Sequence, residues 1–175
     1  HPRDVLARRT LARAEIFHGN RAAALPLLEA LLTELPNDAD LMYLRGRLHL
    51  DNAEGDDAEA ELRLARTWFS RAHRADPNQF QSLYRFALSY MNEGGRPSEN
   101  TANALLLAQQ LAPQVVEIRL NAAMMQIARG DVDYAEALLR PVLTDPHYPE
   151  LAAEARRLID AARATPTITP ASEAD

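Results

Sequence analysis

The fold is decided by the stretch DLMYLRGRLHL at residues 40–50 and by the stretch LRLARTWFSRAHRADP at residues 62–77. In the second stretch Leu62, Ala65, Phe69 and Ala72 recur at steps of three and four residues, which is the spacing of one face of an α-helix. Pro77 ends this pattern, because proline disrupts the backbone hydrogen bonding of a helix interior. The two stretches therefore predict a pair of helices.

The same arrangement recurs along the whole chain. Pro36, Pro77, Pro113 and Pro146 each end a helical pattern, at spacings of 41, 36 and 33 residues, and turns rich in Gly, Asn or Asp lie between them. Ala and Leu dominate and β-branched runs are missing, so the sequence predicts an all-α protein of about nine helices. One helix pair cannot bury its apolar face alone, and we therefore expect the pairs to stack.

These residues resemble the tetratricopeptide repeat (TPR) family. Residues 40–48 resemble its helix A, where the small Gly46 allows close helix approach, and residues 65–77 resemble its helix B. The resemblance implies an α-solenoid of four stacked helix-turn-helix repeats forming a right-handed superhelix. The implied units are residues 4–36, 38–77, 79–113 and 115–146, followed by a capping helix at 149–164 and a disordered tail at 165–175.

Composition excludes several classes of function. The 175 residues include no Cys, which excludes disulfides, thiolate zinc sites and a Cys nucleophile. There are 25 acidic residues against 19 basic ones, all Arg, and the net charge of −6 argues against nucleic-acid binding. No apolar run is long enough to predict membrane insertion. Because the chain begins without Met, we expect a C-terminal segment of a larger protein, in the cytoplasm or the periplasm.

The chemical inventory does not favour an enzyme. There is no HExxH pair, no phosphate-binding glycine-rich loop and no GxSxG motif, so we predict no catalytic residue, no metal and no cofactor. The His residues lack metal-ligand spacing, and His73 is expected on a solvated helix face. The acidic run from Asp51 to Glu61 does not fit a calcium loop, and we expect a solvated insertion with the next helix beginning near Asp57.

The resemblance instead implies a binding surface, because the A helices of TPR arrays line a concave groove. Carried over position by position, that groove contains four Arg, two Tyr and no carboxylate, although the chain as a whole is acidic. Such a groove favours a partner that carries carboxylates, which Arg can bind through two parallel hydrogen bonds. The groove residues selected in this way are Arg9, Arg13, Tyr43, Arg47, Gln81, Tyr84, Arg85, Leu88, Asn121 and Met124.

The leading functional prediction is a non-catalytic module that binds a peptide or protein segment, either acidic or with a free C-terminal carboxylate. The terminal-carboxylate clamp of some TPR domains is not predicted, because Leu44 stands where that clamp needs Asn. Two alternatives remain open. The chain is the substrate-recruiting region of a larger bacterial enzyme such as a peptidase, or it is a self-assembly scaffold that forms homo-oligomers through Trp68 and the acidic insertion. For the groove residues themselves, packing between helices or pairing with acids is the competing interpretation.

Overall fold

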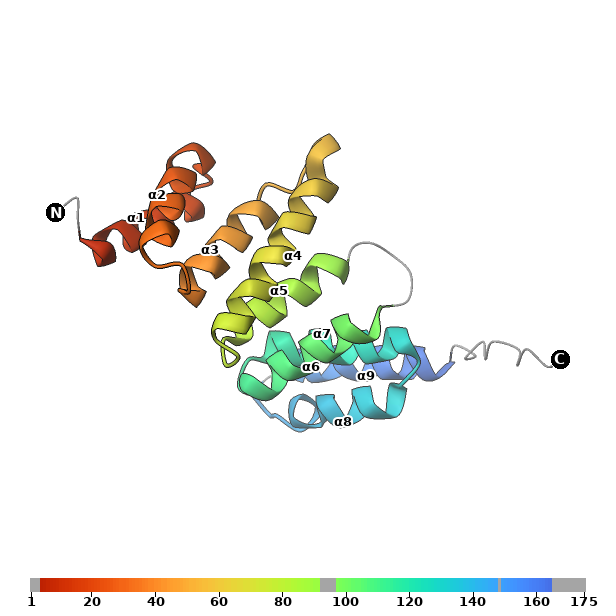
Figure 1. Cartoon of the computed structure of the whole chain (residues 1–175). Coiled ribbons are helices and arrows are strands. Elements are labelled where there is room, and N and C mark those ends of the chain that lie inside the picture. Colours follow the sequence, from red (N-terminus) through yellow and green to blue (C-terminus); the bar gives the residue numbers. More distant parts are fainter. Residues whose placement is uncertain (1–3, 92–96, 148, 165–175) are drawn as a thin grey trace.

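The computed structural model describes residues 4–91, 97–147 and 149–164, and every regular element in these ranges is helical (Figure 1). The helices follow one another in chain order from one end of the molecule to the other, as the figure shows. The all-α repeat fold is thus confirmed, and the predicted tail lies outside the described residues. The elements are α1 (Val5–Phe17), α2 (Arg21–Glu34), α3 (Ala39–Leu50), the 3-10 turn η1 (Gly55–Asp57), α4 (Ala58–Ala75), α5 (Phe80–Met91), α6 (Glu99–Leu111), α7 (Val116–Arg129), α8 (Val132–Leu143) and α9 (Pro149–Ala164).

Short polar side chains fix where several helices begin. The carboxylate of Asp38 accepts a hydrogen bond of 3.0 Å from the backbone N–H of Leu41 at the start of α3, a standard N-cap that satisfies one otherwise unpaired donor. Asp4, Asn20, Ser98 and Asp131 cap α1, α2, α6 and α8 in the same way. Helix α4 begins at Ala58, next to the expected position near Asp57.

Helices α3 and α4 pack tightly because α3 carries a glycine at the contact. A Cβ placed on Gly46 would lie 2.6 Å from two ring carbons of Phe69, which is closer than Cβ contacts occur. Phe69 is fully buried, and its ring lies 6.0 Å from that of Tyr43 on α3. The predicted role of Gly46 as the small residue at this approach is therefore confirmed.

The buried side chains form two clusters, one toward each end of the array. The first joins α1, α2 and α3 around residues such as Leu28 and Leu41, and the second joins α5 to α9 around residues such as Leu105, Ile118 and Leu139. Helix α9 covers the end of the second cluster with Ala155 and Ile159. The core is thus distributed along the stack, as expected when each repeat contacts mainly its neighbours.

The acidic insertion is exposed to solvent at most of its acids, as expected, and Glu61 is the exception. Glu61, with a side chain only 15% exposed, accepts hydrogen bonds from Arg21 Nη2 of α2 at 2.9 Å and from His49 Nδ1 of α3 at 2.7 Å. The bond from Arg21 holds the pKa of Glu61 below its ordinary value. Asp51 pairs with Arg47 at 3.0 Å, so two of the acids serve as internal partners of cations.

Candidate partner-binding site

The predicted groove residues lie on α1, α3, α5 and α7, the first helices of the four pairs. Tyr84 and Asn121, which come from successive pairs, meet through a hydrogen bond in which Asn121 Nδ2 donates to the Tyr84 hydroxyl at 2.7 Å. The guanidinium carbon of Arg85 lies 6.0 Å from the centroid of the Tyr84 ring. The structure therefore brings three of the predicted residues together at the junction of α5 and α7.

The hydroxyl of Tyr84 is already occupied within the protein. It donates to Glu117 Oε1 at 2.7 Å while it accepts from Asn121, and the Tyr84 side chain is buried. Burial, together with the bond to Glu117, raises the pKa of Tyr84 to about 12. Tyr84 thus acts as a joint between two repeats, and Glu117 places a carboxylate on a face that was expected to have none.

Two of the predicted arginines are paired with acids, which corrects the expectation of a uniformly basic groove. Arg9 of α1 donates to Asp38, the residue that also caps α3, and Arg47 pairs with Asp51 one turn further along the chain. The Nε atoms of both arginines are buried without a hydrogen-bond partner among the described residues. The pair of Arg9 therefore joins α1 to the start of α3, whereas the pair of Arg47 lies at the end of its own helix.

The remaining groove residues divide into packed and exposed side chains. Tyr43 and Leu88 are half-buried against the first and second clusters. Arg13, Gln81 and Met124 are exposed. Arg13 and Arg85 have no ion pair among the described residues, so this face keeps two available cations.

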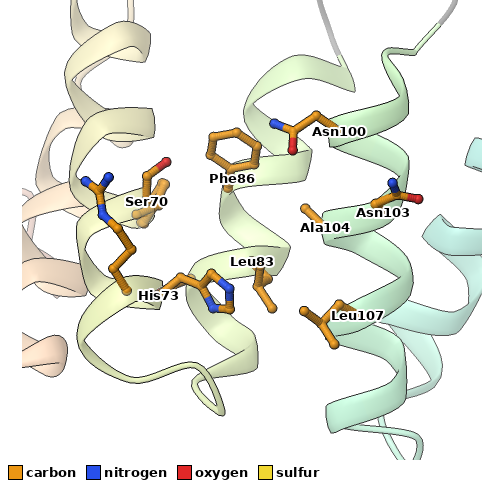
Figure 2. A pocket seen from close by; sticks show the side chains of 11 residues that line it. Ser70, His73, Leu83, Phe86, Asn100, Asn103, Ala104 and Leu107 are labelled. Atoms are coloured by element: carbon orange, nitrogen blue, oxygen red, sulfur yellow. The ribbon is translucent and has the colours of Figure 1, made fainter.

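Sequence reasoning did not predict a cavity on the opposite side of α5. Its volume is about 350 Å³, and Figure 2 shows Ser70 and His73 of α4, Leu83 and Phe86 of α5, and Ala104 and Leu107 of α6 around it. Helical spacing places Leu83 and Phe86 on the face of α5 that points away from Tyr84 and Arg85. The cavity therefore lies on the outer surface of the array, between α4 and α6.

A second hollow, of about 440 Å³, continues from this cavity along α4 and α5. The two hollows share Ser70, Arg74 and Phe86, and we call their combined lining the outer groove. It consists of Arg63, Arg66, Thr67, Phe69, Ser70, His73, Arg74, Ser82, Leu83, Phe86, Tyr90, Asn100, Asn103, Ala104 and Leu107.

His73 departs in part from another expectation, because its imidazole is only partly solvated. It is half-buried, and its Nδ1 atom is shielded from solvent without a hydrogen-bond partner among the described residues. The period of α4 correctly places His73 away from the contact with α3. It does not reveal that α5 and α6 of the next pair rise beside this face and form a cavity around the ring.

A comparison with solved structures finds a thermophilic TPR protein of Thermus thermophilus, with a TM-score of 0.65 and 20% sequence identity. The match covers 93% of this chain and 83% of that protein. No family model matches the sequence, and no curated protein does so either. The chain therefore has a TPR-like helical-repeat fold, as the sequence resemblance implies.

Residues 4–91, 97–147 and 149–164 contain no group of three or more His, Asp or Glu side chains placed to hold a metal ion. None of the helices in the same ranges combines the length and the apolar character needed to cross a membrane.

Proposed function

We propose that this chain is a non-catalytic module that binds a segment of another protein on the face formed by α1, α3, α5 and α7. The TPR-like fold supports a protein-interaction role in general, and the surface chemistry supports a particular face. The observation that carries the proposal is the contact of Tyr84 with Asn121 beside Arg85. It joins two successive repeats and places the half-buried side chains of Arg85 and Asn121 at the same junction.

The neighbouring residues extend this surface along both helices. Gln81 lies one helical turn before Arg85, and Met124 lies one turn after Asn121, and both are exposed. Amide and guanidinium groups offer hydrogen bonds to a peptide backbone and to carboxylates, while Met124 offers an adaptable apolar contact. The preferred partner is therefore an acidic segment, and its carboxylates contact Arg85 and Arg13. They do not bond to the Tyr84 hydroxyl, because that group already donates its hydrogen bond to Glu117.

The test is selection of ligands from a phage-displayed library of 12-residue peptides, followed by titration of the best fluorescein-labelled peptide. Arg85→Glu is expected to weaken binding by at least about tenfold, because it replaces a charge-assisted bond with repulsion. Arg140→Glu is the matched control. Arg140 is exposed on α8 and has no ion pair among the described residues, so binding should change less than about twofold.

We call the face formed by α1, α3, α5 and α7 the A-helix face. The proposal that it binds a partner is rejected if no peptide is selected. It is also rejected if every selected peptide binds equally well to the wild type, to Arg85→Glu and to Arg13→Glu. Changes in the amide signals of α5 and α7 in the ¹⁵N-labelled protein give a second readout. If the proposal is right, the variants that bind the peptide more weakly should also show smaller changes.

A further inference from the structure

We propose that the outer groove is a second binding site, which takes an extended peptide segment with an acidic residue next to a large apolar one. The site lies on the opposite side of α5 from the face discussed above, so it does not depend on that face binding anything. The charge of the groove, an unpartnered polar atom and the shape of the cavity support this second site.

The charge of the outer groove is opposite to that of the chain. Among the residues that the structure describes, no Asp or Glu lines either hollow, although the chain has 25 acidic residues and a net charge of −6. Three arginines do line it, and they differ in availability. Arg63 pairs with Glu59 on its own helix, and Arg66 donates to the hydroxyl and the backbone carbonyl of Ser89.

Arg74 is the arginine best placed to bind a ligand. It is exposed, it has no ion pair among the described residues, and it borders both hollows of the outer groove. It also borders a third hollow toward α3, whose other described lining residues are Asn37, Met42, Arg71 and Ala75, none of them an acid. A guanidinium in this position can bind a carboxylate through two parallel hydrogen bonds.

His73, next to Arg74, supplies a polar group that lacks a partner. Buried polar groups without hydrogen bonds are uncommon in folded proteins, because each costs stability that a partner would restore. The imidazole extends from α4 toward Leu83 of α5 (Figure 2), so a ligand seated in the cavity can reach it. Because Nδ1 itself is shielded from solvent, the ring must turn before a ligand can bond to it; Nδ1 can then accept from a peptide N–H or donate to a carboxylate, depending on its tautomer.

The inner part of the cavity is apolar and small. Leu83 and Phe86 form one wall, and Ala104 and Leu107 form the other (Figure 2). A volume of about 350 Å³ lies at the lower end of the range for ligand pockets, so it accommodates one large apolar side chain together with part of its backbone. The amide of Asn100 is turned toward the space above Phe86, where it can donate to and accept from a peptide backbone.

These features favour a peptide over a nucleic acid. Binding to a phosphate backbone depends on neutralising several phosphates at once, and the acidic chain as a whole repels such a polyanion. A single carboxylate beside an apolar side chain requires only one available cation and one cavity. The outer groove provides both, because Arg74 of α4 borders the cavity itself.

The experiment uses the full chain, labelled with ¹⁵N, and two pools of N-acetylated, C-amidated hexapeptides. In the first pool Asp or Glu adjoins Leu or Phe, and in the second pool Asn or Gln replaces the acid. The acidic pool is expected to shift the amide signals of residues 70–74, 83–86 and 100–107, while the amide pool shifts them at least about fivefold less at equal concentration.

Four variants then test the mechanism, after thermal unfolding has shown that each is folded. Arg74→Gln should weaken binding of the acidic pool at least about fivefold, and Ala104→Phe should weaken it by filling the cavity. Arg140→Gln is the matched control for a lost exposed arginine and should have no effect. Arg85→Glu should also leave this binding unchanged, which separates the outer groove from the A-helix face.

The proposal is overturned by any of three results. The first would be that the acidic pool produces no shifts at millimolar concentration, and the second that both pools shift the same signals equally. The third would be that binding is unchanged in Arg74→Gln and in Ala104→Phe. Tighter binding of a single-stranded oligonucleotide than of the acidic pool at these same signals would also overturn it, in favour of a phosphate site.

Discussion

Gly46 is the residue at which the packing of α3 on α4 tolerates least change. We predict that Gly46→Ala lowers the free energy of unfolding by about 1–2 kcal/mol. The added methyl group collides with the buried ring of Phe69; overpacking costs about 1–3 kcal/mol, and the better helix propensity of Ala returns up to about 1 kcal/mol. Urea denaturation measures the difference.

The double variant Gly46→Ala with Phe69→Leu identifies the cause. If the collision is responsible, the two changes together destabilise less than the sum of each alone, by at least about 0.5 kcal/mol. A Gly46→Ala protein that is as stable as the wild type would contradict the close approach.

A second prediction concerns the titration of Tyr84 and its effect on stability at high pH. Its ordinary pKa of 10.0 is raised to about 12 in the folded protein. The unfolded chain therefore releases this proton at a lower pH than the folded chain does. The stabilisation is complete below about pH 10 and is lost as the pH rises from 10 to 12. Tyrosinate absorbance should show one late-titrating tyrosine that is missing from Tyr84→Phe.

Tyr84→Phe also removes both hydrogen bonds of the hydroxyl, and we expect a loss of about 1–2 kcal/mol at pH 7. Tyr134→Phe is the control, because Tyr134 is 39% exposed on α8. A late-titrating step that persists in Tyr84→Phe and disappears in Tyr134→Phe would refute the assignment.

Single residues also show where sequence reasoning succeeds and where it stops. Gly46 and Phe69 were predictable, because both positions follow from helical spacing and from the size a close contact permits. The pairing of Arg9 with Asp38 was not, because the sequence places Asp38 in a turn without showing that α1 passes beside it. The partner of a long side chain depends on how neighbouring repeats pack against each other, and the sequence does not show this packing.

At the scale of the elements, Glu61 connects three helices through its bonds with Arg21 and His49. His49 is buried, and desolvation lowers its pKa although the bond to Glu61 opposes that effect. Below its ordinary pKa of 6.5, the unfolded chain binds a proton that the folded chain does not, so stability falls as the pH decreases from about 7 to 5. The depressed pKa of Glu61 adds a further loss below about pH 4.5.

Denaturant unfolding of the wild type and of His49→Gln across this range tests the prediction. The variant should be less stable at pH 7 and should lose less stability between pH 7 and 5. His18→Gln, at the exposed end of α1, is the control and should keep the wild-type slope. Parallel curves for the wild type and His49→Gln would show that another group controls the acid response.

The helices themselves were largely predictable, and the surfaces between them were not. Prolines and capping residues mark many of the helix ends in the sequence, and α4 begins within a residue of the expected position. The outer groove was missed because Arg63, Thr67, Ser70 and Arg74 follow the period of a polar helix face, which predicts exposure to solvent. Only the course of α5 and α6 beside that face turns it into a groove.

At the scale of the whole molecule, the two buried clusters predict that the ends of the array unfold with some independence. In a stack of repeats, stability is approximately a sum of repeat stabilities and nearest-neighbour interfaces. Leu28 of the first cluster and Leu139 of the second are both essentially unexposed. Truncation of either to Ala is expected to cost about 2–5 kcal/mol, but each in its own part of the chain.

Hydrogen exchange followed by mass spectrometry distinguishes a local from a shared loss. Leu28→Ala should speed exchange in α1 to α3 and leave α7 to α9 near the wild-type rate, and Leu139→Ala should do the reverse, because partial opening requires only the weakened interface to break. The two substitutions remove the same atoms from equally buried sites, so each controls for the other. Equal acceleration along all helices in both variants would mean that the array unfolds as a single cooperative unit, coupled through α3, α4 and α5 strongly enough to override the division of its core.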